Sequence, residues 1–227
     1  MRRFLFALLL VASAVGVVAR ANADVPPLSA AARSAGFVDV RSVVPRAIID
    51  LRYATANNFT RMQLYPADAR CLVHESMAPG LAAAAATLAS HGDVLVFWDC
   101  YRPHDVQVKM FDVVPNPAWV AKPSSYARSH EAGRSVDVTI ASAQEQCPPA
   151  RQLAGRCLAD MGTDFDDFSS RATAFATAGV SADEQANRAR LRDAMSAGGL
   201  SVYSGEWWHF DGPGAGDGRP ILDVPVD

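Results

Sequence analysis

The most constraining feature of this chain is the stretch 129–139, in which His130 and Asp137 are separated by six residues. Residues 135–140 alternate in hydrophobicity and include β-branched side chains, a pattern that predicts a strand. Gly133 permits a tight backbone turn just before that strand. We therefore expect His130 on the turn and Asp137 inside the strand, with both side chains directed at one point.

An imidazole and a carboxylate that converge in this way suit zinc, and a catalytic zinc commonly has three protein ligands and one open position. A third ligand is available downstream, where His209 follows Glu206 by three positions. On a regular strand these two side chains face opposite ways, so we expect a bend or a strand start that turns both toward the metal. The sequence thus predicts one Zn²⁺ per chain, bound by His130, Asp137 and His209, with Glu206 placed to take a proton from water.

Each half of this pattern has a simpler explanation when it is considered alone. His130 could be a loop histidine that binds no metal, and Asp137 could accept hydrogen bonds from loop amides. The presence of two complementary halves in one chain favours the metal site over both alternatives.

Composition places the chain among ordinary globular proteins. Of its 227 residues, 50% are hydrophobic and 20% are charged, which is enough for one domain with its own core. The net charge is −3, and no long basic run follows the first few residues. A nucleic-acid partner is therefore not expected.

The N-terminus has the composition of a secretory signal. Arg2 and Arg3 supply positive charge, residues 4–18 are apolar, and residues 21–23 form a small-x-small cleavage site. A membrane anchor is the alternative, but the apolar run is short for a span. We expect a signal peptide at 1–23, a mature domain at 24–227 without a membrane span, and export, most simply to a periplasm.

Export makes disulfides permissible for the four cysteines. Cys147 and Cys157 flank a proline-rich polar loop and could pair across it. A pair of Cys71 with Cys100 is open, because connectivity does not follow from sequence. Cys100 could instead be a catalytic thiol, although a buried or paired cysteine is favoured because the histidines already supply the chemistry.

The rest of the pattern predicts strands and helices of a single α+β domain. Strands are expected at 37–44, 47–51, 94–98 and within 200–210, and helices at 81–90, 105–113 and 181–197. The run 94–98 is continuously apolar, as in a buried strand. We expect a central, mainly antiparallel sheet that carries the zinc site and is flanked by helices.

Three further features have two interpretations each. Arg102 follows the buried strand and precedes Pro103, so it could face a cleft or pair with a surface carboxylate. Tyr53 could be a core aromatic or a wall of the substrate pocket. Residues 158–168 contain four aspartates, but their spacing differs from that of an EF-hand loop, so calcium binding is not favoured.

Several motifs, in order along residues 50–210, resemble those of zinc D-alanyl-D-alanine dipeptidases of the vancomycin-resistance type, within the D,D-peptidase and Hedgehog-like superfamily. The motifs are residues 50–60, 70–72, 101–103, 130–137, 161–166 and 206–209. The resemblance implies that His130, Asp137 and His209 bind zinc. It also implies that Glu206 is the general base and that Arg102 polarises the scissile carbonyl. Tyr53 and Asp166 match positions that contact the free amino group of the substrate.

The chain departs from that family just before its first zinc histidine. The family usually has a substrate-binding serine two residues before the histidine, where this chain has Arg128, followed by Ser129. Arg128 could bind a C-terminal carboxylate bidentately, or it could fill the pocket and change the substrate. The two residues after the histidine also differ, being Glu131 and Ala132 in place of Ser-Arg.

The resemblance implies zinc-dependent hydrolysis of the small dipeptide D-Ala-D-Ala to D-alanine. A related alternative is a zinc D,D-carboxypeptidase or endopeptidase that acts on peptidoglycan stem peptides. A closed pocket with an amine-binding carboxylate would favour the dipeptide, whereas an open groove would favour longer peptides. A non-catalytic zinc-binding module is a third hypothesis, but such a module needs neither Glu206 nor Arg102.

Overall fold

The fold is organised around two long neighbouring strands, β4 (Val94–Asp99) and β5 (Ser135–Ser142). They are seen in a computed structural model that describes residues 25–143 and 146–226. All of β4 and nearly all of β5 is buried, as the apolar run 94–98 predicts. The two strands pair antiparallel, and their register shifts between Phe97 and Asp99.

The other strands extend this pair into a seven-stranded sheet. β2 (Ile48–Ile49) runs parallel to β4, while the remaining pairings are antiparallel. The short strands of this sheet are β6 (Gln152–Leu153), β7 (Arg156–Leu158), β8 (Ser201–Val202) and β9 (His209–Asp211). β9 lies beside the first half of β5 and β7 beside its second half. The prediction of a central, mainly antiparallel sheet within an α+β fold is confirmed.

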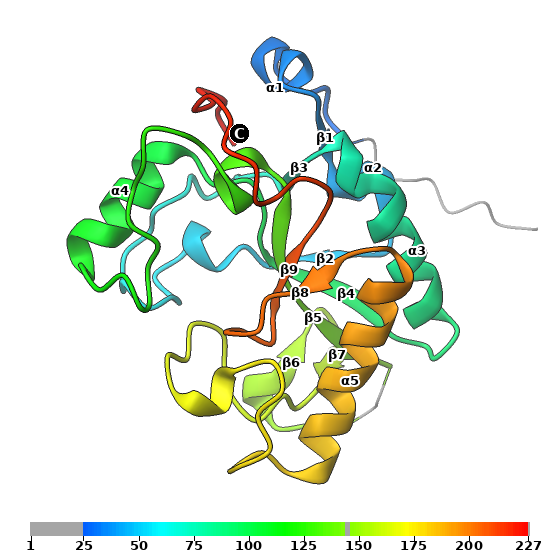
Figure 1. The fold of residues 1–227 in the computed structure, drawn as a ribbon. Coiled ribbons are helices and arrows are strands. Elements are labelled where there is room, and N and C mark those ends of the chain that lie inside the picture. The colour runs from blue at the N-terminus through cyan, green and yellow to red at the C-terminus, as the bar shows by residue number, and fades with distance from the viewer. Residues whose placement is uncertain (1–24, 144–145, 227) are drawn as a thin grey trace, which may run out of the picture.

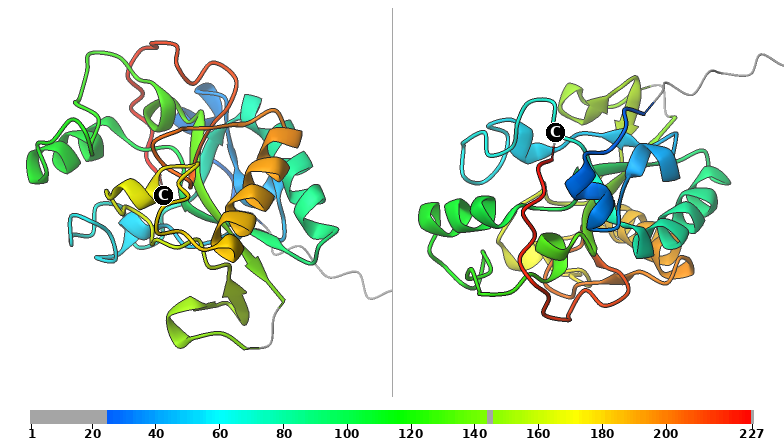
Figure 2. Two further views of the ribbon diagram at one scale, coloured as in Figure 1. Left: turned by 60° about the horizontal axis from the view of Figure 1, so that its bottom comes forward. Right: turned by 90° about the horizontal axis from the view of Figure 1, so that it is seen from above.

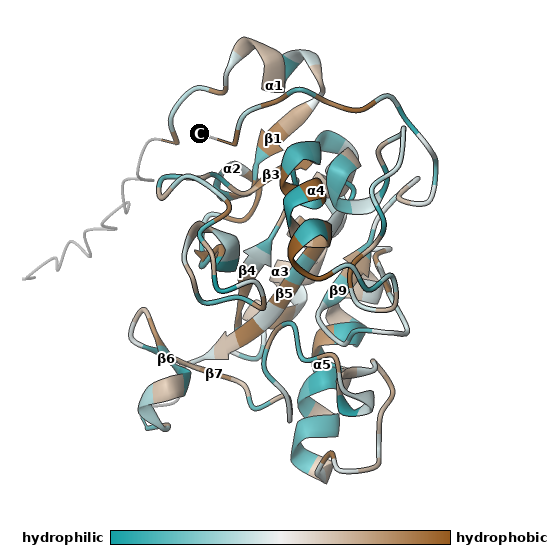
Figure 3. Ribbon diagram, turned by 90° about the vertical axis from the view of Figure 1, so that its left-hand side faces the viewer, coloured by the Kyte–Doolittle hydropathy of each residue, from teal (hydrophilic) through white to brown (hydrophobic). Residues whose placement is uncertain are grey.

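Two long helices lie together on one side of the sheet (Figure 1). α3 (Ala78–Ala89) is alanine-rich, and α5 (Ala182–Ala197) begins with a capping box between Ser181 and Glu184. They approach so closely that a Cβ on Gly198 would lie 2.1 Å from the Gly80 carbonyl oxygen. Figure 3 shows that α5 is hydrophilic over most of its length, as expected of a helix with one face exposed to solvent.

The opposite side of the sheet is occupied by α4 (His104–Val113) and by long connecting segments. In Figures 1 and 2 the segments around residues 55–65, 115–126 and 165–175 lie away from α3, on the side of the sheet where α4 lies. The short 3₁₀ turns are η1 (Arg52–Ala54), η2 (Glu75–Met77), η3 (Ser129–Ala132), η4 (Pro149–Arg151) and η5 (Ser170–Ala172). The helix-poor side therefore has the loops that can form a binding site.

The N-terminal region differs from the sequence expectation. A strand was predicted over 37–44, but only β1 (Phe37–Asp39) is extended, and it pairs with β3 (Leu72–His74). The chain then turns into α2 (Val40–Val43), because the Asp39 carboxylate caps that helix by accepting from the Arg41 amide. A short helix, α1 (Ala30–Ser34), also forms where only an arm was expected.

Two disulfides join Cys71 to Cys100 and Cys147 to Cys157. The alternative of a catalytic thiol at Cys100 is therefore wrong. The predicted signal peptide at 1–23 lies outside the described residues. Within the ranges 25–143 and 146–226, no helix has both the length and the apolar character that a membrane crossing requires.

Candidate metal centre and its pocket

The three predicted ligands come from three elements that meet at the centre of the sheet. His130 lies in η3, just before β5, and Gly133 ends that turn with φ +63°. A Cβ at Gly133 would lie 2.2 Å from the Phe37 ring, so the turn requires glycine for space as well as for conformation. Asp137 lies within β5, and His209, the first residue of β9, is its direct partner across the ladder.

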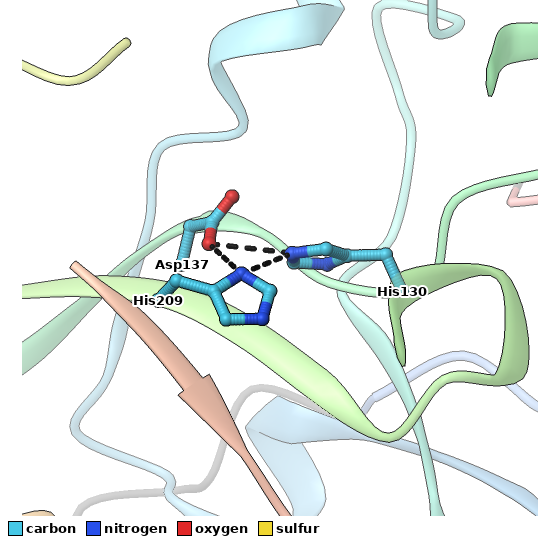
Figure 4. Close-up of side chains that lie close together, drawn as sticks. All are labelled: His130, Asp137 and His209. Carbon is cyan, nitrogen blue, oxygen red and sulfur yellow. Dashed lines mark hydrogen bonds and ion pairs between the residues drawn. The ribbon is translucent and has the colours of Figure 1, made fainter. Parts of the chain in front are cut away.

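Figure 4 shows these side chains converging on one point. The His130 Nε2 atom lies 3.1 Å from His209 Nδ1 and 3.3 Å from Asp137 Oδ1, and the last two atoms are 3.0 Å apart. A tetrahedral zinc with bonds of about 2.0–2.1 Å holds its ligand atoms about 3.3 Å apart. The triangle therefore has the size that zinc needs.

The outer nitrogens of both imidazoles have partners that fix the tautomers. His130 Nδ1 donates to the Cys100 carbonyl at 2.8 Å, and His209 Nε2 donates to Asp211 at 3.1 Å. The inner nitrogens therefore present lone pairs, and these face the Asp137 carboxylate. Three electron-pair donors that face one another are stable only with a cation or a proton between them, and this donor set fits a metal ion.

The electrostatics of the centre also favour positive charge. Burial alone would lower the pKa of His209, but hydrogen bonds to Asp137 and Asp211 outweigh it and raise the pKa to about 10. Burial would raise the pKa of Asp137, but His130 and His209 hold it well below the usual range. The carboxylate is therefore ionised throughout the neutral pH range.

Glu206 lies beside the cluster, in a turn just before β9. Its amide donates to the Tyr203 carbonyl, and its Oε2 lies 3.9 Å from His209 Nδ1. The chain bends here, which resolves the difficulty that residues three apart on a strand face opposite ways. Burial raises the pKa of the Glu206 carboxyl above its ordinary value, a direction that suits a general base.

Arg102 extends toward the same pocket from the end of β4. Its Nη2 lies 2.7 Å from Asp99 Oδ2, and its Nη1 donates to Gln107 Oε1 at 2.7 Å. Asp99 is fully buried, so the interpretation of Arg102 as a partner of a surface carboxylate is wrong. The guanidinium also lies over the Tyr53 ring, 5.4 Å from its centroid, which further fixes its position.

Tyr53 and Asp166 form a second polar cluster in the pocket. The Tyr53 hydroxyl donates to the Asp166 carboxylate and lies 3.1 Å from each of its oxygens. Burial, reinforced by the negative charge of Asp137, raises the pKa of Asp166 well above the ordinary value. The two predicted residues therefore lie together, and a cationic group bound beside Asp166 would favour its ionised form.

The candidate ligands, Glu206, Arg102, Tyr53 and Asp166 all line one cavity of about 710 Å³. The nine residues that the sequence nominated line it together: Tyr53, Arg102, Arg128, Ser129, His130, Asp137, Asp166, Glu206 and His209. The Arg128 side chain is exposed, and its guanidinium carbon lies 4.3 Å from the Tyr126 ring centroid, so it lies at the edge of the cavity. Ser129 lies nearer the candidate metal ligands, with its Oγ 2.9 Å from that of Ser135 and 3.4 Å from His209 Nε2.

Three residues that hold the site in place were missed from sequence. Asp211 stands two positions after His209, and strand periodicity alone would have placed it on the same face. Asp99 ends the apolar run three residues before Arg102, which is also a readable signal. No sequence signal identifies Gln107, because its contact with Arg102 depends on how α4 packs.

Comparisons with known proteins agree with this geometry. A family model described as D-Ala-D-Ala dipeptidase matches residues 33–227. A D-alanyl-D-alanine dipeptidase of Escherichia coli (strain K12) is 33% identical over 186 residues, covering 82% of this chain and 89% of the relative. A D-alanyl-D-alanine dipeptidase of Enterococcus faecium is 29% identical over 199 residues, covering 77% of this chain and 90% of the relative.

Proposed function

The chain belongs to the D-Ala-D-Ala dipeptidase family, and we propose that it hydrolyses D-Ala-D-Ala to two molecules of D-alanine with one zinc ion per chain. One observation carries the proposal. The metal-binding triangle, a neighbouring glutamate, a fixed arginine and an amine-binding carboxylate all line the same cavity. A dipeptide requires this combination, because its ammonium, scissile carbonyl and attacking water must be bound together.

His130 Nε2, Asp137 Oδ1 and His209 Nδ1 would hold the zinc ion. When bound, zinc supplies Lewis acidity that acidifies water and polarises the scissile carbonyl. The chain contributes the second partners, Asp211 and the Cys100 carbonyl, which keep both imidazoles in the ligating tautomer.

Glu206 is the proposed general base. It takes a proton from the attacking water and delivers it to the amine that leaves when the peptide C–N bond breaks. Its place beside His209 supports this role, because a carboxylate there is close to the ligand triangle without being one of its three corners.

Arg102 is the proposed partner of the developing oxyanion. Asp99 and Gln107 bind its guanidinium on two sides, so it meets the substrate in a fixed orientation and little reorganisation is needed. Fixed cationic groups of this kind act where charge develops in the transition state.

Asp166 and Tyr53 are proposed to hold the ammonium of the substrate. A carboxylate buried in the pocket interacts strongly with an ammonium group, and the Tyr53 hydroxyl holds it in orientation. Arg128 and Ser129 are proposed to contact the carboxyl end. Because Arg128 is exposed at the edge of the cavity, it does not fill the pocket, and its guanidinium is accessible to a carboxylate.

Export to a periplasm is part of the same proposal. It is supported by the signal-like residues 1–23 and by two disulfides, which persist in oxidising compartments.

A zinc D,D-carboxypeptidase or endopeptidase is the second candidate function, and the size of the cavity supports it. About 710 Å³ lies within the range of sites for ligands larger than a dipeptide of alanine.

Substrate choice separates the two candidates. The purified mature chain would be given D-Ala-D-Ala, L-Ala-L-Ala and a pentapeptide that ends in D-Ala-D-Ala, each with a chelator control and zinc added back. The proposal expects zinc-dependent release of D-alanine from D-Ala-D-Ala alone. Cleavage of the pentapeptide alone would establish the carboxypeptidase and overturn the assignment of the amine site.

A further inference from the structure

A chain of aromatic rings leads outward from the proposed ammonium site. Tyr53, which binds Asp166, contacts Phe59 edge-on with ring centroids 6.3 Å apart, and Phe59 contacts Phe168 at 5.4 Å. Phe168 in turn stacks on Trp119, with centroids 5.0 Å apart and planes only 4° from parallel. Tyr53 is 2% exposed and Trp119 is 47% exposed, so the chain runs from the core to the surface.

The last three rings, Phe59, Trp119 and Phe168, form what we call the aromatic wall. They come from three segments far apart in sequence, and all three line the cavity. The Trp119–Phe168 stack joins the loop after α4 to the loop before α5. In Figure 1 the first of these loops (green) lies beside α4 and the second (yellow) lies below it, both on the side of the sheet away from α3.

The aromatic wall is tied to the catalytic groups. Gln107 donates to the Ala121 carbonyl at 2.6 Å, two residues from Trp119, and accepts from Arg102 through its side-chain oxygen. Val120, next to Trp119 in the same loop, is itself buried. Phe168 is only two residues from Asp166. The stack therefore has a fixed position relative to both the ammonium site and Arg102.

We propose that the stacked Trp119–Phe168 pair closes the pocket beyond the ammonium site and so restricts the enzyme to dipeptides. This inference rests on the proposed function. A peptide extended at its N-terminus replaces the ammonium with a neutral amide and must continue through the space that the rings occupy. Apolar rings offer no hydrogen-bond partner to that amide, so its burial there is unfavourable. Asp166 would also lose its cationic partner.

The test uses the mature chain and three variants, Trp119→Ala, Phe168→Ala and Trp119→Phe. The substrates are D-Ala-D-Ala and L-Lys-D-Ala-D-Ala, and released D-alanine is measured for both. We expect the ratio of kcat/KM for the tripeptide to that for the dipeptide to rise by at least about tenfold in both alanine variants. Trp119→Phe keeps a stacked ring, so its ratio should remain near that of the unaltered chain.

Phe175→Ala is the matched control. Phe175 is 64% exposed on the same loop as Phe168, and its ring packs under Arg192 at 4.9 Å, outside the described lining of the cavity. Its substitution should leave the ratio unchanged, which separates an effect of the wall from a general loosening of the loop.

The outcomes distinguish this inference from the proposed function. If the unaltered chain releases no D-alanine from D-Ala-D-Ala, the proposed function fails. If it cleaves the dipeptide and the tripeptide equally well, or if both alanine variants keep dipeptide activity with an unchanged ratio, the aromatic wall is not the restriction. Because Trp119 is 47% exposed, Trp119→Ala is expected to fold, and its thermal unfolding midpoint is recorded beside each assay.

Discussion

The proposed metal-binding floor of the pocket (His130, Asp137 and His209) differs from the aromatic wall in how its side chains are held. On the floor, every side chain is buried and each imidazole has a second hydrogen-bond partner fixed by the sheet. In the wall, rings from separate loops meet mainly by stacking, and Trp119 is half exposed. The comparison suggests that the floor determines which reaction occurs and that the wall determines which substrate is admitted.

Removal of a floor ligand should have the largest effect. His209→Ala takes away one corner of the triangle and leaves Asp137 with one imidazole partner fewer. We expect the variant to lose stoichiometric zinc and all measurable turnover, because the remaining two ligands hold the ion poorly. Metal content after dialysis is the measurement, and a full complement of zinc in this variant would remove His209 from the ligand set.

Glu206→Ala should separate chemistry from metal binding. Glu206 lies beside the triangle and is not one of its three corners. We expect zinc to remain bound while kcat falls by about 10²–10⁴-fold, the usual contribution of a general base. Metal content and steady-state kinetics are measured on the same sample, and equal losses of zinc and turnover would contradict the assignment.

Asp211→Asn tests how far the support of the floor extends. Asp211 accepts from His209 Nε2, and loss of such a partner commonly lowers metal affinity by about 10–100-fold. Zinc affinity is measured by competition with a chromophoric chelator. Asp217→Asn is the control, because Asp217 lies on the same C-terminal segment and pairs with Arg219 at the surface. If the two variants bind zinc equally well, Asp211 does not support the ligand.

Tyr53→Phe should change the pH dependence at the amino end of the substrate. Burial raises the pKa of Asp166, and the hydrogen bond from Tyr53 opposes that rise. As the pH falls through this pKa, Asp166 gains a proton and loses the charge that binds an ammonium. The acid limb of kcat/KM should therefore move to higher pH in the variant, by about one unit or less. A limb that stays fixed or moves to lower pH would contradict this role.

Arg128→Ala should have the smallest effect. The guanidinium is exposed, so its contact with a substrate carboxylate is weakened by solvent. We expect KM for D-Ala-D-Ala to rise about three- to tenfold with little change in kcat. Arg128→Lys keeps the charge without the bidentate geometry, so its KM should lie between those of the unaltered chain and Arg128→Ala. A fall in kcat with unchanged KM would move Arg128 from substrate binding to the chemical step.

The floor and the neighbouring Glu206 could be predicted from sequence because the signals for them are local. His130 and Asp137 flank a glycine turn, and Glu206 and His209 stand three residues apart, so two short motifs specify four groups. Asp211 could have been found by strand periodicity and was not. The aromatic wall could not be predicted from sequence, because Trp119 and Phe168 meet only when two distant loops fold over the sheet.

Secondary structure shows the same division. The buried strand at 94–98 and the helix at 181–197 were predicted correctly, since their signals are local. Residues 40–43 belong to the stretch 37–44 that was predicted as a strand, but the Asp39 cap makes them helical. Tertiary contacts of Asp39, which also binds Arg70 at 2.9 Å, override the intrinsic preference of the valines.

The most direct measurement of the central claim is a zinc titration of the chelator-treated mature chain with D-Ala-D-Ala as substrate. Bound zinc and the rate of D-alanine release are followed together. The account predicts that the rate rises in proportion to bound zinc and reaches its plateau at one ion per chain. Release of D-alanine that does not depend on zinc, or one bound zinc with no release, would contradict it.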